Sequence, residues 1–258
     1  MKLNRMFILD GSLTLILTAA IVIACFSMAG NPAQAEEPEP LFYVENVFGA
    51  EGRQIEVPIN YRDISKMVGA EFILSYDPDI LDPVDVIAGS TLPQDASFEY
   101  NLDHSSNSIK IVAAWSGGGD SYPPPEGEFC RVVFEMLQGG PAGAPAEAPL
   151  SISGLVVGVI ETVGGGDTVV ELDTYSTGDG SVDVYEVVYG DVNEDGVTDF
   201  RDARYAFRVY LGHEEVSSDY QYLVMEVDGD GTIDFRDARL IFRYYLGLEN
   251  TFPVEQTN

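Results

Sequence analysis

The sequence contains few cysteines and few basic residues, and both shortages restrict what the chain can be. Only two of its 258 residues are cysteine, Cys25 and Cys130. Because Cys25 lies in a segment with the pattern of an export signal, Cys130 has no intramolecular partner in a processed chain, and a disulfide framework is excluded. The chain has 13 lysines and arginines against 43 aspartates and glutamates, a net charge of −30. Such a surface repels nucleic acid and anionic membranes and attracts cations.

The common catalytic motifs are also absent from the sequence. It contains no Gly-x-Ser-x-Gly, no His-Glu-x-x-His and no Cys-His pattern. His104 and His213 lie far apart in polar, loop-like contexts, so we expect both to be solvated. The many acidic residues are compatible with the carboxylate pair of a glycoside hydrolase, and that class is kept as an alternative.

Residues 1–35 have the pattern of a signal peptide. Lys2 and Arg5 precede an uncharged run at 11–30, which ends near the small-x-small cleavage site Ala-Gln-Ala. Two alternatives remain open. The residues before Cys25 resemble a lipoprotein processing box, and the uncharged run is about as long as the ~20 residues that span a bilayer, so it could serve as an anchor. All three interpretations place the remaining chain outside the cytoplasm, either secreted or anchored at the cell surface.

Residues 41–187, which follow a short acidic linker at 36–40, are predicted to form a β-sandwich. Short apolar runs such as Ile55–Ile59 and Phe129–Phe134 are separated by Gly, Pro and Asp. Strands at this spacing, with turn residues between them, are typical of sandwiches. A domain of this size buries roughly 68–70% of its unfolded surface and needs no cross-link.

Two acidic loops, residues 191–202 and 226–237, repeat with a shift of thirty-five residues. Oxygen-bearing side chains occupy loop positions 1, 3, 5, 9 and 12, and Gly196 or Gly231 occupies position 6, which is the spacing of an EF-hand calcium loop. Calcium takes six to eight oxygen ligands, and the glycine permits the sharp turn that brings them together.

The spacing assigns a ligand set to each of two calcium ions. The first set is Asp191, Asn193, Asp195, the Val197 carbonyl, Asp199 (through water) and Asp202; the second is Glu226, Asp228, Asp230, the Thr232 carbonyl, Asp234 and Asp237. Position 12 is Asp in both loops, one methylene shorter than the usual Glu, and Glu226 is longer than the usual Asp at position 1. We therefore expect the second loop to be the poorer site.

A helix is predicted after each loop, and the two helices are near copies. Residues 200–204 and 235–239 are identical, and Gly212 and Gly247 are helix stops. Two calcium loops, each followed by one helix, resemble a type I dockerin, the calcium-dependent plug of cellulosome-like assemblies. The expected small all-α domain covers 188–250, with a C-terminal tail at 251–258.

The dockerin resemblance implies a cohesin-bearing partner that docks on the repeated helices. The arginines of each helix stand at i, i+3 and i+7, so they share one stripe. The residues expected to bind the partner are Phe200, Arg201, Arg204, Arg208, Phe235, Arg236, Arg239 and Arg243. The identity of the repeats predicts two docking orientations related by a pseudo-twofold axis. The alternative role for these arginines is to neutralise nearby loop acids.

A second resemblance concerns the sandwich. Residues 68–81, followed by 86–92, look like the third and fourth strands of a cohesin, and 48–59 and 127–134 also fit. Cohesins are jelly-roll sandwiches that receive dockerin-bearing proteins, and an Asn-x-Asp segment of their third strand grips the partner. This chain has Gly-Ala-Glu there, so Glu71 keeps the acid while the amide is lost. The alternative for Glu71 is an outward-facing strand residue without a partner.

Together the two modules predict a non-catalytic extracellular adaptor, which we expect to act in polysaccharide-degrading complexes. One module would receive a dockerin, the other would plug into a cohesin, and copies could also associate head to tail. A carbohydrate-binding sandwich is the alternative, for which an exposed row of aromatic residues would be needed. Trp115, Tyr100 and Tyr122 are the candidates for such a row.

Overall fold

The structure is a computed structural model that describes residues 41–117, 122–141, 143–172 and 176–256. The expected signal, lipidation site, anchor and acidic linker lie outside these residues. The strands are β1 Phe42–Val44, β2 Val47–Ala50, β3 Gln54–Tyr61, β4 Met67–Ser75, β5 Leu81–Ala88, β6 Ser97–Asp103, β7 Ser108–Ala114, β8 Gly127–Met136, β9 Ala146–Val163, β10 Gly166–Glu171, β11 Thr177–Gly178 and β12 Gly180–Tyr185. The helices are α2 Phe200–Tyr210, α3 Asp219–Met225, α4 Phe235–Tyr245 and the 3₁₀ helix η1 Pro253–Gln256.

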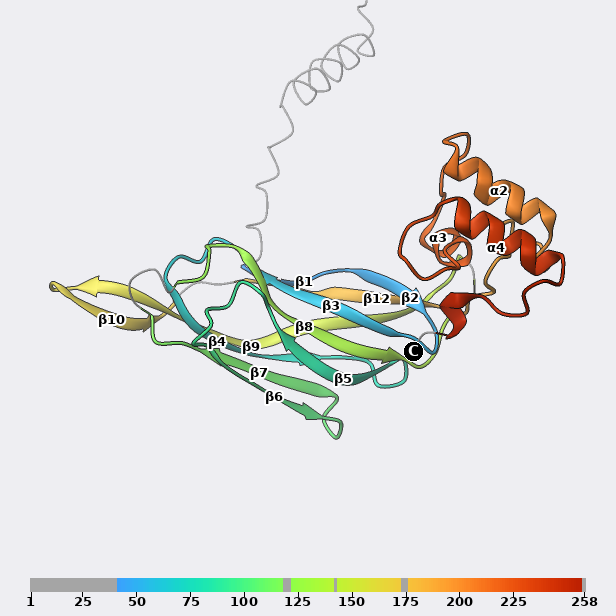
Figure 1. Cartoon of the computed structure of the whole chain (residues 1–258). Helices are drawn as coiled ribbons and strands as arrows, with labels where there is room; N and C mark the ends of the chain where they lie inside the picture. Colours follow the sequence, from blue (N-terminus) through green and yellow to red (C-terminus); the bar gives the residue numbers. More distant parts are fainter. Residues whose placement is uncertain (1–40, 118–121, 142, 173–175, 257–258) are drawn as a thin grey trace, which may run out of the picture. The chain divides into compact units, whose positions relative to one another are not determined.

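The strands form two sheets that face each other, which confirms the predicted β-sandwich (Figure 1). One sheet has the order β11-β1-β3-β8-β5, and the other has the order β2-β12-β9-β4-β7-β6, with β10 paired to β9. Alternate residues point into the shared core. Phe72 and Leu74 of β4 and Ile111 of β7, for example, are buried. The intervening residues of β4 and β7 therefore lie on the outer face of the second sheet.

Strands β2, β6 and β11 and helix α3 were not expected from the sequence. Most of β6 is exposed, because it is the edge strand beyond β7. Phe98, Tyr100 and Leu102 alternate with polar residues in its sequence, and this alternation is the signal that could have predicted the strand. Helix α3 has only seven residues. Its start is marked by Ser218, whose side chain accepts a hydrogen bond from the Gln221 backbone N–H at 3.1 Å. Among the described residues, no helix is long and apolar enough to cross a membrane.

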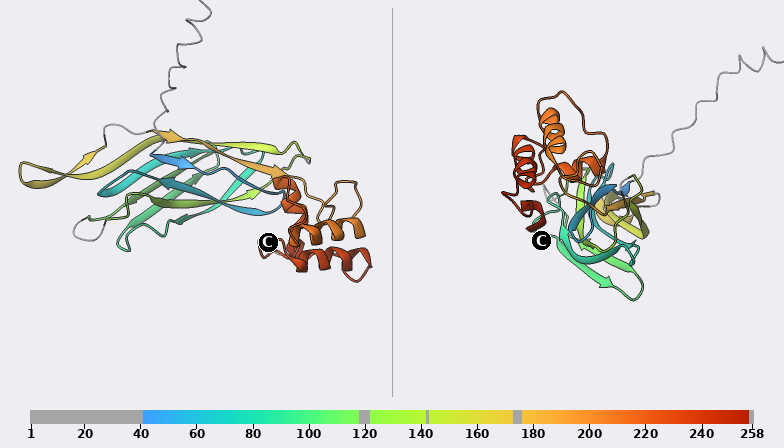
Figure 2. Two further views of the ribbon diagram at one scale, coloured as in Figure 1. Left: turned by 90° about the horizontal axis from the view of Figure 1, so that it is seen from above. Right: turned by 90° about the vertical axis from the view of Figure 1, so that its right-hand side faces the viewer.

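Helices α2 and α4 lie side by side (Figure 2). Their inner faces carry small residues, and Ala203, Ala206, Ala238 and Ile241 are buried in a core with Val192 and Met225. The predicted stops are confirmed, since Gly212 and Gly247 follow the helix ends with φ of 69° and 67°. Short side chains at the contact let the two helix backbones approach closely.

The segment expected as a C-terminal tail packs into this helical core. Phe252 is 2% exposed, and its ring stacks on Tyr244 with 4.8 Å between the centroids. The Val254 N–H donates to the Val227 carbonyl at 3.1 Å. Gly190 lies beneath the ring, where a Cβ would approach Phe252 to 2.8 Å. Residues 252–254 are thus structural, although their polar surroundings in the sequence gave no periodic signal.

We predict that Phe252→Ala lowers the free energy of unfolding of the helical module by about 3–5 kcal/mol, because a buried ring is replaced by a cavity. The matched control is Phe242→Ala, since Phe242 is 45% exposed and should cost much less. Thermal unfolding in calcium, followed by helical circular dichroism, measures both. Equal effects of the two substitutions would contradict the packing role of Phe252.

Candidate functional site

The first acidic loop is wound tightly around Asp191. One carboxylate oxygen of Asp191 accepts the Asp195 N–H at 3.1 Å, and the other accepts the Gly196 N–H at 2.9 Å. Gly196 has φ of 84°, a conformation that favours glycine. Asp191 is 4% exposed, so its carboxylate is held inside the turn by these two hydrogen bonds.

Asp202, at the last loop position, closes the same loop from the helix side. Its two carboxylate oxygens accept the Asn193 N–H at 3.0 Å and the Asp199 N–H at 2.8 Å. Asp199 is the N-cap of α2, and the two side chains form a capping box. The Asp-x-x-Asp spacing in the sequence is the signal that could have predicted this cap.

The second loop repeats this geometry. Asp237 is fully buried, and its oxygens accept the N–H groups of Val227 at 3.0 Å and Asp234 at 2.8 Å. Glu226 accepts the Gly231 N–H at 3.2 Å. Carboxylate oxygens of Glu226, Asp228 and Asp237 all lie within 4.8 Å of one another. The longer side chain of Glu226 therefore reaches the centre of the loop, and this set of hard oxygen donors fits calcium.

Burial leaves several of these carboxylates electrostatically unfavourable. Loss of solvent raises the pKa of Asp202 and Asp237 above 3.8, and nearby acids add to the effect. The pKa of Glu226 is raised above 4.5 for the same reason. Close, buried, negatively charged groups are stabilised by a cation, which is what a divalent ion would provide in each loop.

The predicted arginine stripe divides into groups with different partners. Arg201 binds Asp195 at 2.7 Å and Asp199 at 2.9 Å, and Arg236 binds Asp230 at 2.7 Å and Asp234 at 3.0 Å. These two arginines have the alternative role, neutralising loop acids. Arg208 and Arg243 pair with Glu214 at 2.8 Å and Glu249 at 2.7 Å. Within the described ranges, Arg204 and Arg239 make no ion pair.

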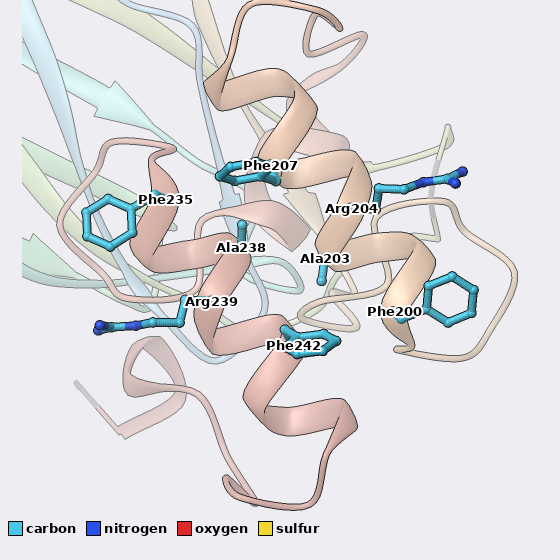
Figure 3. A pocket seen from close by; sticks show the side chains of 8 residues that line it. All are labelled: Phe200, Ala203, Arg204, Phe207, Phe235, Ala238, Arg239 and Phe242. Atoms are coloured by element: carbon cyan, nitrogen blue, oxygen red, sulfur yellow. The ribbon is translucent and has the colours of Figure 1, made fainter.

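Arg204 and Arg239 instead flank a groove of about 450 Å³ between α2 and α4, here called the aromatic groove (Figure 3). It is lined by Phe200, Ala203, Arg204, Phe207, Phe235, Ala238, Arg239 and Phe242. The four phenylalanines are 45–49% exposed, a concentration of apolar surface that a soluble module keeps for a partner. Here the structure brings together four residues predicted to bind a partner and adds Phe207 and Phe242, which the sequence analysis did not assign to a site.

The aromatic groove has an approximate twofold symmetry. In Figure 3 Phe200 and Arg204 lie on one side of the two alanines and Phe235 and Arg239 on the other, and the side chains of each pair are directed outward. The rings of Phe200 and Tyr245 are 6.1 Å apart, and those of Tyr210 and Phe235 are 6.2 Å apart, with the same 56° between planes. The repeat in the sequence is therefore a repeat in space.

On the sandwich, Glu71 lies on the outer face of the second sheet. Its carboxylate is 3.4 Å from Lys110, and both side chains are about half exposed, so this pair contributes little to stability. Beside it is a shallow hollow of about 240 Å³ between β4, β7 and β9. Its floor contains Gly69, Ala114 and Gly158. The residues that line this hollow are mostly apolar, with Glu71 as their one acid, so the hollow is able to receive a group of another protein.

The residues considered for other functions do not converge on a site. Trp115 is 7% exposed, and its indole N–H donates to the Met67 carbonyl at 2.8 Å, so it belongs to the core. The exposed Tyr100 donates its hydroxyl to Asp85. The Nδ1 atom of His104 lies 3.3 Å from a carboxylate oxygen of Asp82, and both side chains are exposed to solvent. Cys130 is buried beside Glu128, and burial raises the pKa of its thiol, which makes it inert.

Comparison with known families decides what the two modules are. Residues 42–158 match the model of the cohesin domain, and residues 189–246 match that of the dockerin type I domain. The chain carries a cohesin domain followed by a type I dockerin domain. Both resemblances drawn from the sequence are thereby confirmed. No curated protein is similar enough to the chain to count as a relative.

Solved cohesin structures are also similar to the sandwich. A non-cellulosomal cohesin from Archaeoglobus fulgidus is 21% identical, with a TM-score of 0.43, over 56% of this chain and 90% of that one. The sixth cohesin of scaffoldin B from Acetivibrio cellulolyticus, in complex with a dockerin, is 23% identical, with a TM-score of 0.43, over 55% of this chain and 96% of that one. A type I cohesin–dockerin complex from Clostridium thermocellum is 19% identical, with a TM-score of 0.45, over 55% of this chain and 96% of that one.

The two domains establish the kind of interaction. Cohesin domains bind dockerin-bearing partners, and dockerin domains bind cohesin-bearing partners. Both are non-catalytic interaction domains, type I dockerins are generally calcium-binding, and proteins with these domains are typically extracellular. The cohesin–dockerin pair thus makes the chain a docking adaptor.

We predict that removing calcium unfolds α2 and α4 and leaves the sandwich folded. Without an ion, the buried carboxylates repel one another, and the small helical core cannot offset this repulsion. Circular dichroism of the whole chain during calcium titration measures the helical signal, and extracellular modules respond at about 10⁻⁴–10⁻³ M. Asp202→Ala and Asp237→Ala should each shift the titration to higher calcium. Unchanged helicity in excess chelator would contradict the prediction.

The raised carboxylate pKa values predict opposite effects of pH on the two forms of the dockerin domain. In the calcium-free form, which we expect to be unfolded near pH 7, protons neutralise Asp202, Asp237 and Glu226, so helicity increases as pH falls toward the raised pKa values. In the calcium form, the same protons compete with the ion, so stability falls. Helical circular dichroism at several pH values without calcium, and thermal unfolding at the same pH values with calcium, measure the two trends. Parallel trends would show that these carboxylates do not bind the ion.

Proposed function

We propose that the protein is a secreted or surface-anchored, non-catalytic adaptor that joins two other proteins through calcium-dependent docking. The aromatic groove carries this proposal, since four half-exposed phenylalanines and two arginines that form no ion pair with any described residue occupy one symmetric surface. Burying these rings against a cohesin removes exposed apolar surface from water. The outer face around Glu71 receives the dockerin of a second protein.

Each of the two loops binds one calcium ion. Asp191, Asn193, Asp195, the Val197 carbonyl and Asp202 hold the first ion, and Glu226, Asp228, Asp230, the Thr232 carbonyl and Asp237 hold the second. Asp199 and Asp234 act through water, because each also serves as a helix N-cap. The bound ions fix the loops, and the loops in turn fix the first turns of α2 and α4, from which Phe200 and Phe235 project. Calcium thereby assembles the docking surface without taking part in a reaction.

The partners belong to polysaccharide-degrading assemblies, as the cellulosome-like context of dockerins implies, and the export signal at 1–35 delivers the adaptor to them. The twofold symmetry of the aromatic groove supports docking in two orientations. Arg201 and Arg236 stabilise the loops, and Arg204 and Arg239 contact the partner. The two contact arginines are equivalent, so either can take the same place against a cohesin.

The test is capture from the secreted fraction of the source cells by the immobilised chain without residues 1–35. We expect cohesin-bearing and dockerin-bearing proteins, identified by mass spectrometry, to be bound in calcium and released by chelator. Arg204→Glu or Arg239→Glu alone should change capture of cohesin-bearing proteins little, because the other orientation remains available. Both together should abolish it and leave dockerin-bearing proteins bound.

Glu71→Arg is the matched variant for the sandwich and should have the reverse selectivity. Capture that is unaffected by chelator, or that carries neither domain, would refute the adaptor function. A large loss from one arginine alone would refute only the two orientations.

A further inference from the structure

Paired residues of neighbouring strands form two rows across the outer face of the second sheet. Glu71 is paired with Val156 on one side and Val112 on the other, and Val112 is paired with Glu99. Paired residues of antiparallel strands point to the same side, so two carboxylates flank Val112 in one row. The next row contains only small residues: Gly158, Gly69, Ala114 and Ser97. A row with two acids therefore lies beside a hollow without large side chains.

The aromatic groove has the complementary features. Its phenylalanines project from the helices, and Arg204 and Arg239 stand beside them without an acidic partner among the described residues. A phenyl ring can lie in the hollow over Gly69 and Gly158, because neither residue has a side chain and the atom nearest to a Cβ on Gly158, in Val68, is 3.6 Å away, an ordinary contact distance. In each docking orientation one guanidinium group, of Arg204 or of Arg239, can meet a carboxylate of Glu71 or Glu99, and an arginine–carboxylate pair is stronger than an ammonium contact. Lys110, which is 3.4 Å from Glu71, is the cation that an arginine would replace.

Both modules carry a net negative charge, so attraction between them is limited to the few residues of opposite charge on the two faces. Residues 36–188 carry 27 acids and 5 bases, whereas 189–258 carry 15 acids and 6 arginines. Both modules are therefore acidic overall and repel each other in general. Four of the six arginines are paired with acids of their own module. The attraction that remains lies between Arg204 and Arg239 on one module and Glu71 and Glu99 on the other.

We propose that the occupant of the outer face is the aromatic groove of a second copy of this chain. This proposal rests on the adaptor function above and names the partner of both surfaces. The connector between β12 and the first loop is residues 186–190, and a chain extends at most ~3.3–3.6 Å per residue, which favours contact between copies over folding back within one copy. The interface is heterologous, so copies associate head to tail into rings or open chains.

The test is sedimentation equilibrium of the chain without residues 1–35, in calcium, over a wide range of protein concentration. We expect concentration-dependent oligomers that chelator dissociates. The plug variant carries Arg204→Glu and Arg239→Glu, and the receptor variant carries Glu71→Arg and Glu99→Arg. Each should weaken association by on the order of a hundredfold, because like charges then face each other. A control with Asp79→Arg and Glu135→Arg changes the net charge as the receptor variant does, but away from the outer face, and should associate like the native chain.

The deciding measurement is the variant that carries all four reversals. It has the net charge of the native chain, and its reversed arginines and carboxylates match again only if the chain is its own partner. Recovery of association supports the proposal, and continued dissociation refutes this pairing of faces. A native chain that stays monomeric in calcium, yet captures cohesin-bearing proteins from the secreted fraction, would refute self-pairing and leave the adaptor function intact. A chain that does neither would refute both.

Discussion

The buried carboxylate at the last position of each acidic loop is the interaction on which the helical module depends. Asp202 and Asp237 each accept backbone N–H groups from the start of the loop and from the helix cap. One side chain thus closes the loop, completes the capping box of the helix and, in the calcium sites proposed above, supplies a ligand oxygen. Because these roles share two oxygen atoms, loop geometry and helix position cannot vary independently, and an ion that holds the carboxylate also holds the helix.

The duplication of this unit explains the docking surface. Two loop–helix units with the same closing carboxylate place Ala203 against Ala238, and the identical side chains that follow them form a symmetric groove (Figure 3). Tertiary contacts also separate arginines that the sequence presents as equivalent. Arg201 and Arg236 turn back to the loops, while Arg204 and Arg239 remain with the exposed rings. The docking face of the two helices is therefore less basic than its two stripes of three arginines indicate.

Much of this could be predicted from the sequence because the signals are local. Loop spacing, repeated helix residues and glycine stops depend on neighbours in the chain, and apolar alternation identified β3, β4, β7 and β8. What could not be predicted depends on residues distant in sequence. Phe252 is buried by Tyr244, and the Glu71–Val112–Glu99 row exists only through strand register. Strand β6 is different, because the alternation of Phe98, Tyr100 and Leu102 is a local signal that could have predicted it. The length of Glu226 predicts a poorer second site, and this stays a prediction, although the Glu226 oxygen lies within 4.8 Å of those of Asp228 and Asp237.

The burial of Cys130 has a consequence for every assembly that this chain enters. Its thiol is enclosed by the sandwich core, so it cannot bridge to another protein without unfolding of that domain. All connections through the described modules are then non-covalent, and under the proposed calcium-dependent docking their lifetime depends on the free calcium concentration of the surroundings and not on the redox potential. A complex joined in this way can be taken apart and rebuilt from the same molecules, with no bond cleaved and no component consumed.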